Sequence, residues 1–215
     1  MNSDTHQLAL WRSEFGRAYT ERNDREKPER VAAWRRLLDG IAPVRVLEVG
    51  CNVGWNLVYL ERLGITELYG VEPQLDVVER ARGRRPDFNI LHGTAFDLPF
   101  RDGYFDLVFT SGVLIHIERD SLDHVLDEMA RVSRRWIAAI EYDHPCEQEI
   151  PYRGHGDALW KRDHGAAWQA RHPELRLIRR LELGAEHGYD DCTAHLFEKP
   201  HRQAPALISI AETKP

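Results

Sequence analysis

A chain of 215 residues with 42% hydrophobic content is long enough to bury the core of one globular domain. Its net charge of −6 excludes the general attraction to nucleic acid that a basic protein has. No apolar run approaches membrane-spanning length, and the first residues lack the basic and apolar regions of a secretion signal, so we expect a cytoplasmic protein without membrane or nucleic-acid partners, either a monomer or a homodimer.

Cysteine and histidine spacing gives no sign of a metal centre. Cys51, Cys146 and Cys192 are widely separated and form neither a disulfide framework nor a Cys-x-x-Cys pair, so we expect free thiols. No His-x-x-x-His spacing occurs around His144 and His155 either. We therefore expect no bound metal.

Apolar runs alternate with amphipathic segments along the chain, which predicts an α/β fold with a Rossmann-like, doubly wound and mostly parallel sheet. The expected elements, in chain order, are a helix over 28–39, a strand over 44–49, a helix over 53–63 capped by Asn52, a strand over 67–71, a helix over 76–82, strands over 88–91 and 105–110, a helix over 121–133 and a strand over 136–141. The last two apolar runs, 175–183 and 192–198, are joined by a short loop and predict an antiparallel hairpin at the sheet edge.

The most informative segment is Val-Leu-Glu-Val-Gly-Cys-Asn-Val-Gly at residues 46–54, followed by Glu72 at the end of the next apolar run. A buried strand that breaks at Gly50 and leads into a helix lets the backbone approach a ligand closely. A carboxylate at the tip of the second strand can accept hydrogen bonds from both hydroxyls of a ribose. This layout predicts a nucleoside site.

The glycine spacing decides which nucleoside ligand fits. A pyrophosphate needs Gly-x-Gly-x-x-Gly at the start of the helix, but Trp55 and Asn56 fill the place where phosphates would pack. The segment resembles motif I of class I S-adenosylmethionine-dependent methyltransferases, Glu/Asp-x-Gly-x-Gly-x-Gly, with Asn52 in place of the central glycine. Asparagine tolerates a left-handed backbone better than other side chains do, so this replacement is mild.

Two later segments extend the resemblance. Residues 93–100 resemble the loop that lies along the adenine, with Thr94 where aspartate is common, which leaves Asp97 or backbone groups to contact the base. Residues 105–116 resemble motif IV, whose strand end faces the transferred methyl group. The resemblance implies S-adenosylmethionine as cofactor, S-adenosylhomocysteine as product, and a seven-stranded sheet. The implied cofactor-binding residues are Tyr19, Arg22, Glu48, Gly50, Asn52, Gly54, Asn56, Glu72, Pro73, Thr94, Ala95, Ser111 and His116.

Further segments resemble a narrower group, the pseudaminic acid biosynthesis-associated methylases. They are residues 10–23, 50–57, 141–142, 152–155 and 161–163. The similarity covers nearly the whole chain to Lys199, and that group also has asparagine at the central position of motif I. It implies a single domain over residues 1–199, with an N-terminal helical lid over 1–27, an acceptor-side insertion over 143–173 and a tail over 200–215.

Aromatic and polar residues near the N-terminus suit a lid over a charged ligand. In this interpretation Phe15, Tyr19, Arg22 and Asn23 form a lid, in which an aromatic side chain stacks on the cofactor and Arg22 pairs with the cofactor's carboxylate. The alternative is an amphipathic helix whose aromatic side chains only cover the sheet.

Three residues at strand ends are candidate catalytic bases. His116 follows the motif IV strand, and Glu141 and Asp143 follow the expected fifth strand. Ligands of open parallel sheets bind outside the carboxyl ends of the strands, which favours a site there. The alternatives are a hydrogen-bonded core histidine and an exposed strand terminus.

The insertion after the fifth strand concentrates cationic and aromatic residues in an otherwise acidic chain. We expect it to bind a small polar acceptor through Tyr142, Tyr152, Arg153, His155 and Lys161. The alternative is a cover loop whose charges pair with one another.

The expected function is therefore methyl transfer from S-adenosylmethionine to the oxygen or nitrogen of a small polar metabolite, such as a nonulosonic-acid, sugar-related or natural-product intermediate. Two alternatives stay open at this stage. One is a non-catalytic S-adenosylmethionine-binding partner subunit, and the other is a nicotinamide-dependent oxidoreductase, which Trp55 and Asn56 oppose.

Overall fold

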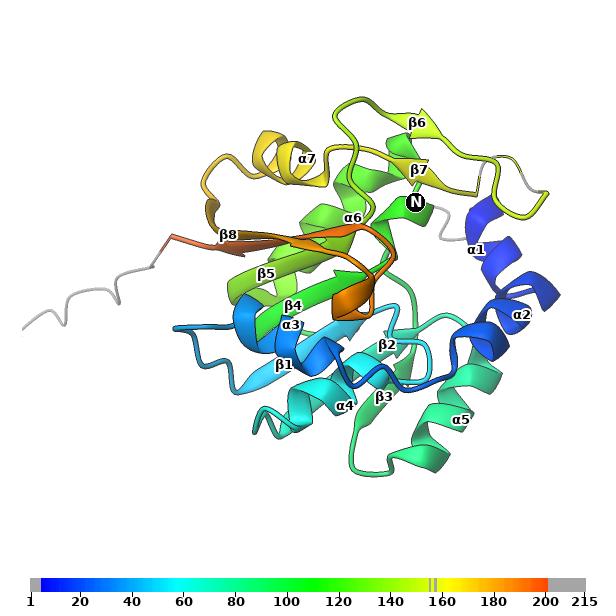
Figure 1. The fold of residues 1–215 in the computed structure, drawn as a ribbon, viewed down its shortest axis with the longest axis horizontal. Coiled ribbons are helices and arrows are strands. Elements are labelled where there is room, and N and C mark those ends of the chain that lie inside the picture. The colour runs from blue at the N-terminus through cyan, green and yellow to red at the C-terminus, as the bar shows by residue number, and fades with distance from the viewer. Residues whose placement is uncertain (1–4, 155, 157, 201–215) are drawn as a thin grey trace, which may run out of the picture.

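The computed structural model describes residues 5–154, 156 and 158–200. A seven-stranded sheet runs through the molecule in the order β3-β2-β1-β4-β5-β9-β8 (Figure 1). Its strands are β1 (Arg45–Val49), β2 (Glu67–Glu72), β3 (Asn89–His92), β4 (Phe105–Ser111), β5 (Ser133–Glu141), β8 (Arg176–Leu183) and β9 (Cys192–Glu198).

The strand pairing places a crevice at the carboxyl edge of the sheet. β1 pairs in parallel with both β2 and β4, so the strand order reverses on either side of β1. Crossovers that leave this point in opposite directions separate there and leave room for a ligand. β9 is antiparallel to both β5 and β8 and completes the expected edge hairpin. The predicted fold class is confirmed.

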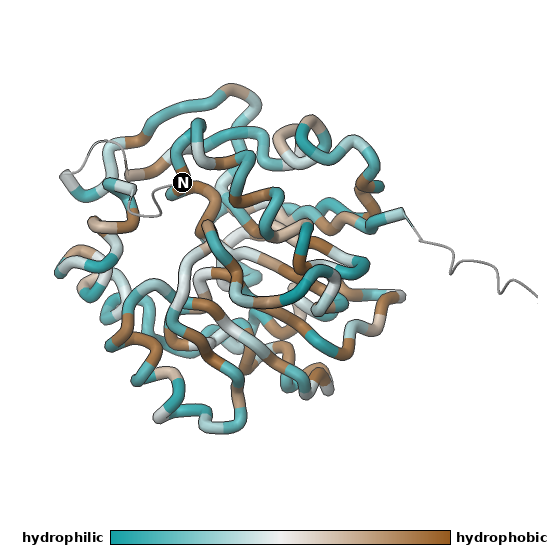
Figure 2. Tube along the Cα trace, turned by 180° about the vertical axis from the view of Figure 1, so that it is seen from behind, coloured by the Kyte–Doolittle hydropathy of each residue, from teal (hydrophilic) through white to brown (hydrophobic). Residues whose placement is uncertain are grey.

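Helices cover both faces of the sheet, which explains why the central strands are apolar on both sides (Figure 1). One core cluster contains Val46 of β1 and residues of α3 (Arg30–Leu37), α4 (Trp55–Glu61) and α5 (Leu75–Arg84). The other contains Leu47 and residues of α6 (Arg119–Val132) and α7 (His164–Arg171). Hydrophobic stretches run through the central strands, whereas much of the outer chain is hydrophilic (Figure 2).

The helices and strands expected from the sequence are present, with ends that differ by a few residues. One detail was wrong: Asn52 does not cap the helix after β1. Gly54 is the N-cap residue, with a φ of 83°, and α4 begins at Trp55. Asn52 also has a left-handed φ, 49°, and its Oδ1 accepts a hydrogen bond from the Val53 amide at 2.8 Å. The turn therefore continues for two more residues before the helix can start.

Two short helices precede the sheet, α1 (His6–Trp11) and α2 (Glu14–Asn23). Their N-caps are Thr5, which accepts from the Leu8 amide, and Ser13, which accepts from the Phe15 amide. Arg17 of α2 pairs with Asp76 of α5 at 3.2 Å, which ties these helices to the sheet domain.

The chain after β5 forms an insertion with little regular structure. Its two short strands, β6 (Gln148–Glu149) and β7 (Trp160–Lys161), pair in antiparallel fashion before α7. The 3-10 turns η1 (Leu114–His116) and η2 (Ala185–His187) lie after β4 and β8. None of the described helices is long and apolar enough to cross a membrane. The expected tail over 200–215 falls outside the described residues, apart from Pro200.

Candidate functional site

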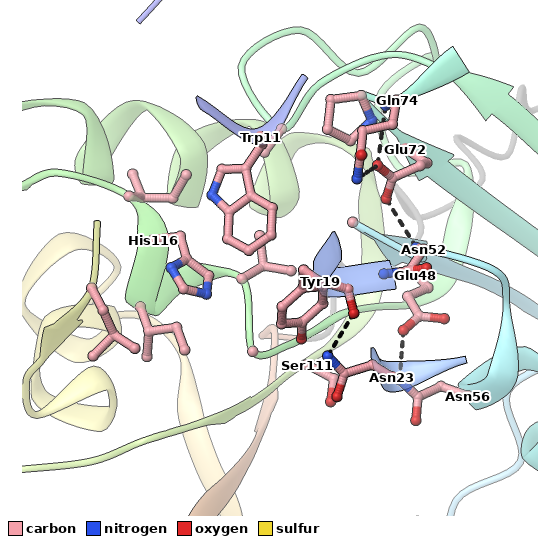
Figure 3. Close-up of a pocket in the computed structure, with 18 of the residues that line it drawn as sticks. Trp11, Tyr19, Asn23, Glu48, Asn52, Asn56, Glu72, Gln74, Ser111 and His116 are labelled. Atoms are coloured by element: carbon pink, nitrogen blue, oxygen red, sulfur yellow. Dashed lines mark hydrogen bonds between the residues drawn. The ribbon is translucent and has the colours of Figure 1, made fainter. Parts of the chain in front are cut away.

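A cavity of about 560 Å³ opens at the carboxyl edge of the sheet and is lined in part by Trp11 of α1 and by Tyr19 and Asn23 of α2 (Figure 3). All residues expected to bind a cofactor line it except Gly54, whose role is to start α4. The lining set is Tyr19, Arg22, Glu48, Gly50, Asn52, Asn56, Glu72, Pro73, Thr94, Ala95, Ser111 and His116. Asp97, the alternative contact to a base, does not line the cavity, whereas Thr94 does. The expected motifs therefore meet at one place.

Glu72 ends β2 and is 4% exposed. Its Oε2 accepts a hydrogen bond from the Asn52 amide at 2.9 Å, and its Oε1 accepts from the backbone and side chain of Gln74 at 3.1 and 3.4 Å. Burial nevertheless raises the pKa of Glu72 to about 7. The carboxylate keeps acceptor capacity toward the cavity, because two oxygens offer about four lone-pair sites.

Glu48 and Asn56 form a second buried polar pair, joining β1 to α4. The Asn56 Nδ2 atom donates to Glu48 Oε1 at 2.6 Å (Figure 3). Glu48 Oε2 and Asn56 Oδ1 are buried and have no hydrogen-bond partner among the described residues. Burial raises the pKa of Glu48 to about 8. Two adjacent unpaired acceptors in a cavity wall indicate a site for a ligand with several N–H donors.

Gly50 lies where the chain leaves β1, with a φ of 73°. A Cβ atom built at this position would lie 2.6 Å from Cγ2 of Val113, which follows the neighbouring strand β4. Glycine is therefore required here both by its backbone conformation and by the close approach of the motif IV segment.

Five rings from three parts of the chain cover the cavity. Trp11 of α1 contacts Phe15, Tyr19 and His116, with ring centroids 5.3, 5.0 and 4.5 Å apart. Tyr152 of the insertion lies 5.7 Å from Phe15 and 5.8 Å from His116. We call these five residues the aromatic cover. Trp11, Tyr19, His116 and Tyr152 line the cavity directly, so the cover joins the N-terminal helices to the insertion above the sheet.

His116 is 6% exposed and has a defined hydrogen bond. Its Nδ1 lies 2.5 Å from the carbonyl oxygen of Ala158 in the insertion. Because a carbonyl can only accept, Nδ1 carries the proton and Nε2 keeps its lone pair. Burial lowers the pKa of His116 to about 4, although the bond to Ala158 acts in the opposite direction. The ring is therefore neutral at pH 7, and the ordinary histidine range of pH 6 to 7 does not apply to it.

Two of the three expected bases lie elsewhere, which corrects the sequence-based assignment. Glu141 is fully buried, and its carboxylate accepts from the amides of Val113 and Ile115 at 3.2 and 3.4 Å, so it holds the turn η1 in place. Asp143 contacts Nε2 of His195 at 3.5 Å and the His164 amide at 3.4 Å. Neither residue lines the cavity. The sequence placed Glu141 and Asp143 correctly at the carboxyl edge of the sheet, but it did not reveal that both side chains lie outside the cavity lining.

The insertion contributes fewer groups to the cavity than expected. Tyr142, Tyr152 and Arg153 line it, but Lys161 does not. The Lys161 ammonium lies 5.4 Å from the centre of the ring of Tyr142, which does line the cavity. His155 falls outside the described residues.

Several lining residues were not assigned from the sequence. Trp11 and Gln74 are two of them, and Lys27, Arg30 and Tyr189 are three more. Trp11 and Tyr19 face the same cavity from two helices separated by the Ser13 cap, so one helical period cannot connect them. The other four residues reach the cavity only through the tertiary arrangement of the chain, and local sequence patterns do not reveal such contacts.

A family model described as a methyltransferase domain matches residues 47–135. The matched segment runs from β1 to the beginning of β5 and contains Gly50, Glu72 and His116. The tRNA U34 carboxymethyltransferase of Trichlorobacter lovleyi is 37% identical over 103 residues, which make up 44% of this chain and 31% of that protein. The chain therefore spans less than a third of the length of this curated relative.

Solved structures share the fold at low sequence identity. The 1,6-didemethyltoxoflavin-N1-methyltransferase of Burkholderia thailandensis, solved with 1,6-didemethyltoxoflavin and S-adenosylhomocysteine, has a TM-score of 0.70 at 14% identity, covering 90% of this chain and 88% of its own. A Haloferax volcanii putative methyltransferase in complex with the Trm112 activator has a TM-score of 0.67 at 19% identity, covering 90% and 99%. The chain thus shares the fold of these structures, and residues 47–135 match the methyltransferase domain model, which agrees with the enzyme class expected from the sequence. The narrower resemblance to the pseudaminic acid-associated group stays a prediction.

Proposed function

We propose that this protein binds S-adenosylmethionine in the cavity and transfers its methyl group to an oxygen or nitrogen of a small polar acceptor. The observation that supports this most strongly is the convergence of Glu72, Glu48 and His116 on one cavity, each from a different strand end. The methyltransferase domain match covers all three positions.

The unpaired polar atoms of the cavity fit the cofactor. Glu72 is placed to accept from the ribose hydroxyls, and residues 94–96 line the wall that an adenine would contact. The unpaired oxygens of Glu48 and Asn56 match the ammonium group of the methionine end, which has three N–H donors. When bound, the cofactor supplies an activated methyl group on a sulfonium that leaves as a neutral thioether.

The protein's task in this reaction is to position the acceptor and to exclude water. The aromatic cover closes the cavity from above and supplies a dry surface around the place of transfer. Nε2 of His116 has a lone pair at all pH values above about 5, since the pKa of the ring is lowered to about 4. It is suited to accept a proton or a hydrogen bond from an acceptor hydroxyl.

The cavity favours a small acceptor over a nucleic acid. Residues of α1, α2 and the insertion line it together with the strand ends, and the net charge of −6 gives no general attraction to a phosphate backbone. Within the small polar class we favour a nonulosonic-acid or another sugar-related or natural-product intermediate, as the narrower resemblance implies.

A second candidate is an RNA acceptor. The relative from Trichlorobacter lovleyi is named for the transfer of a carboxymethyl group to tRNA, and its likeness covers 44% of this chain. That segment is less than a third of the relative, so the likeness is compatible with a shared cofactor domain and a different acceptor.

One experiment separates the candidates. The protein is incubated with S-adenosylmethionine labelled in the methyl group and with sialic-like sugar acids, their nucleotide-activated forms, amino-acid-like metabolites or bulk tRNA. Transfer of label to the small acceptors supports the proposal, and transfer to tRNA alone favours the second candidate. Cofactor binding without transfer to any acceptor favours a non-catalytic partner subunit. Calorimetric titration with NAD tests the oxidoreductase alternative, which Trp55 opposes by occupying the start of α4 with its indole bonded to Asp24 at 2.9 Å.

A further inference from the structure

The carboxyl group of Glu141 is bonded to the backbone of the segment that carries His116. Glu141 ends β5, is fully buried and does not line the cavity. Its Oε1 accepts a hydrogen bond from the Val113 amide at 3.2 Å, and its Oε2 accepts from the Ile115 amide at 3.4 Å. Val113 and Ile115 both line the cavity. A side chain outside the cavity therefore holds the backbone of its wall.

The turn η1 depends on this carboxyl group, because it has little support of its own. It is three residues long, and its N-cap residue Val113 makes no side-chain cap bond. Within the turn, the His116 amide donates to the Val113 carbonyl at 2.9 Å. The first amides of a helical turn find no acceptor inside that turn, so they need one from outside. Glu141 supplies it.

The His116 ring is held separately by the insertion. Its Nδ1 donates to the Ala158 carbonyl at 2.5 Å. Two anchors thus determine where Nε2 of His116 lies: Glu141 holds the backbone, and Ala158 holds the ring. A backbone carbonyl does not change its charge with pH. Of the two anchors, only Glu141 can gain or lose a proton.

Titratable side chains from three other elements lie near the Glu141 carboxyl group. They are Tyr19 of α2, Arg162 after β7 and Cys192 of β9. Burial raises the pKa values of Tyr19 and Cys192 to about 12, so both are neutral at pH 7. Arg162 is positive and also pairs with Glu147 at 3.2 Å. Burial raises the pKa of Glu141 to about 7, although Thr110 of β4 and the amides of η1 act in the opposite direction.

Protonation of Glu141 conflicts with its hydrogen bonds. An ionised carboxylate only accepts, whereas a protonated carboxyl group has one O–H that must donate. Both oxygens face backbone N–H groups, so the added proton lies against a second donor. At least one bond to η1 is then weakened, and the backbone that carries His116 is less firmly held.

We propose that Glu141 is a positioning residue for methyl transfer, whose ionised carboxylate holds η1 so that Nε2 of His116 faces the acceptor. It acts through His116 and contacts neither cofactor nor acceptor. The inference rests on the proposed function, which gives His116 its role. It adds a pH dependence near neutrality that the His116 ring cannot supply, because the pKa of that ring is lowered to about 4.

The test follows His116 by NMR in the ligand-free protein labelled with ¹⁵N. Long-range ¹H–¹⁵N spectra report the tautomer and the surroundings of the ring, and His116→Asn assigns its signals. The backbone amide signals of Val113 and Ile115 report the bonds to Glu141. Spectra are recorded from pH 6 to pH 8 for the wild type and for Glu141→Gln, whose side-chain NH₂ also lies against an N–H group.

Asp143→Asn is the matched control. Asp143 lies two residues after Glu141, and burial raises its pKa to about 6. Its carboxyl group contacts His195 and the His164 amide instead of η1. We expect this variant to titrate like the wild type.

In the wild type, the two amide signals and the His116 ring signals should shift together, with a common midpoint near pH 7. In Glu141→Gln they should resemble the wild type at pH 6 and stay constant to pH 8. Ring signals that do not follow the two amides overturn the proposal, as does a ring titration that persists in Glu141→Gln. The wild-type comparison alone decides the matter if Glu141→Gln does not fold.

Kinetics extend the test to any acceptor found with the labelled cofactor. The wild-type kcat should rise about tenfold from pH 6 to pH 8, following the ionised fraction of Glu141, and should be low and constant in Glu141→Gln. A merely structural role would lower the folded fraction and leave the pH profile of kcat unchanged, which overturns the proposal. Failure of the wild type to bind S-adenosylhomocysteine would instead contradict the proposed function, and the spectra would still show whether Glu141 positions the ring.

Discussion

Nδ1 of His116 and the carbonyl oxygen of Ala158 are 2.5 Å apart and connect the end of β4 to the insertion 42 residues later. This contact fixes the ring orientation and the tautomer of the only candidate base that lines the cavity among the described residues. It also means that the insertion positions a group whose backbone belongs to motif IV.

The first prediction separates the two roles of His116. The His116→Asn side chain can still donate to Ala158 but has no ring nitrogen facing the cavity. We expect it to reduce kcat by about a hundredfold or more while leaving S-adenosylhomocysteine affinity and Tm close to those of the wild type. The wild-type rate should show no acidic limb from this residue between pH 6 and 7, because its pKa is lowered to about 4. Normal turnover by His116→Asn would leave His116 with a structural role only.

The second prediction concerns Glu72. Glu72→Ala removes the proposed acceptor of the ribose hydroxyls and should weaken S-adenosylmethionine binding by about 1.5–3 kcal/mol. It also leaves the amides of Asn52 and Gln74 without their partner, so a change in Tm is expected. Glu72→Gln keeps one acceptor oxygen and serves as the milder companion. An unchanged dissociation constant in Glu72→Ala, measured on folded protein, would place the nucleoside elsewhere.

The third prediction uses two glycines with the same backbone conformation. Gly50 has a φ of 73° and a Cβ there would meet Val113 at 2.6 Å, whereas Gly40 has a φ of 75° and open space around it. Gly50→Val should abolish cofactor binding, because it displaces the motif IV segment and fills ligand space. Gly40→Val carries the same backbone strain without the collision and should keep binding. Calorimetry and far-UV circular dichroism on both variants make the comparison.

Much of the fold and of the cofactor wall could be predicted from the sequence, because the relevant information is local. The glycine turn, the acidic residue at the next strand end and the strand periodicities each occupy short segments. Side-chain direction at a strand end is different. Glu141 ends β5 as expected, but the turn η1 takes both of its oxygens, and no local pattern shows this.

Two cations that line the cavity show the same limit more strongly. Lys27 and Arg30 belong to a segment that resembles an ordinary helix start, and their partner Gly188 is about 160 residues away in the chain. Only the return of the chain after β8 brings the three together. The sequence suggested the insertion as the source of positive charge, whereas the structure adds a second source at the start of α3.

The fourth prediction follows from the raised pKa of Glu48, about 8 in the ligand-free protein. Below that pH the carboxyl is largely protonated, and an ammonium ligand favours its ionised form, so binding releases a proton. Affinity for S-adenosylhomocysteine should therefore increase from pH 6 to pH 8, approaching tenfold per pH unit where one proton is released. 5′-Methylthioadenosine lacks the ammonium and should show a weaker dependence, to which Glu72 contributes with its pKa of about 7. Calorimetry in buffers of different ionisation enthalpy counts the protons, and an affinity that falls with rising pH would contradict this assignment.

The last prediction separates two cations of the insertion that the sequence treats alike. Arg153 lines the cavity next to Tyr152, while Lys161 is not among the lining residues and lies beside Tyr142. Arg153→Ala should raise the KM of an anionic or polyhydroxylated acceptor, or lower kcat/KM, by about tenfold, corresponding to ~1.4 kcal/mol. S-Adenosylmethionine affinity should stay constant if Arg153 contacts the acceptor, as we propose. Lys161→Ala is the matched control from the same insertion, and we expect acceptor kinetics close to those of the wild type.

If kcat/KM falls equally in both variants, in proportion to the folded fraction of each, the insertion is only a cover whose charges stabilise it. A loss confined to Lys161→Ala would mean that the acceptor enters from the outer face of the insertion and not through the cavity.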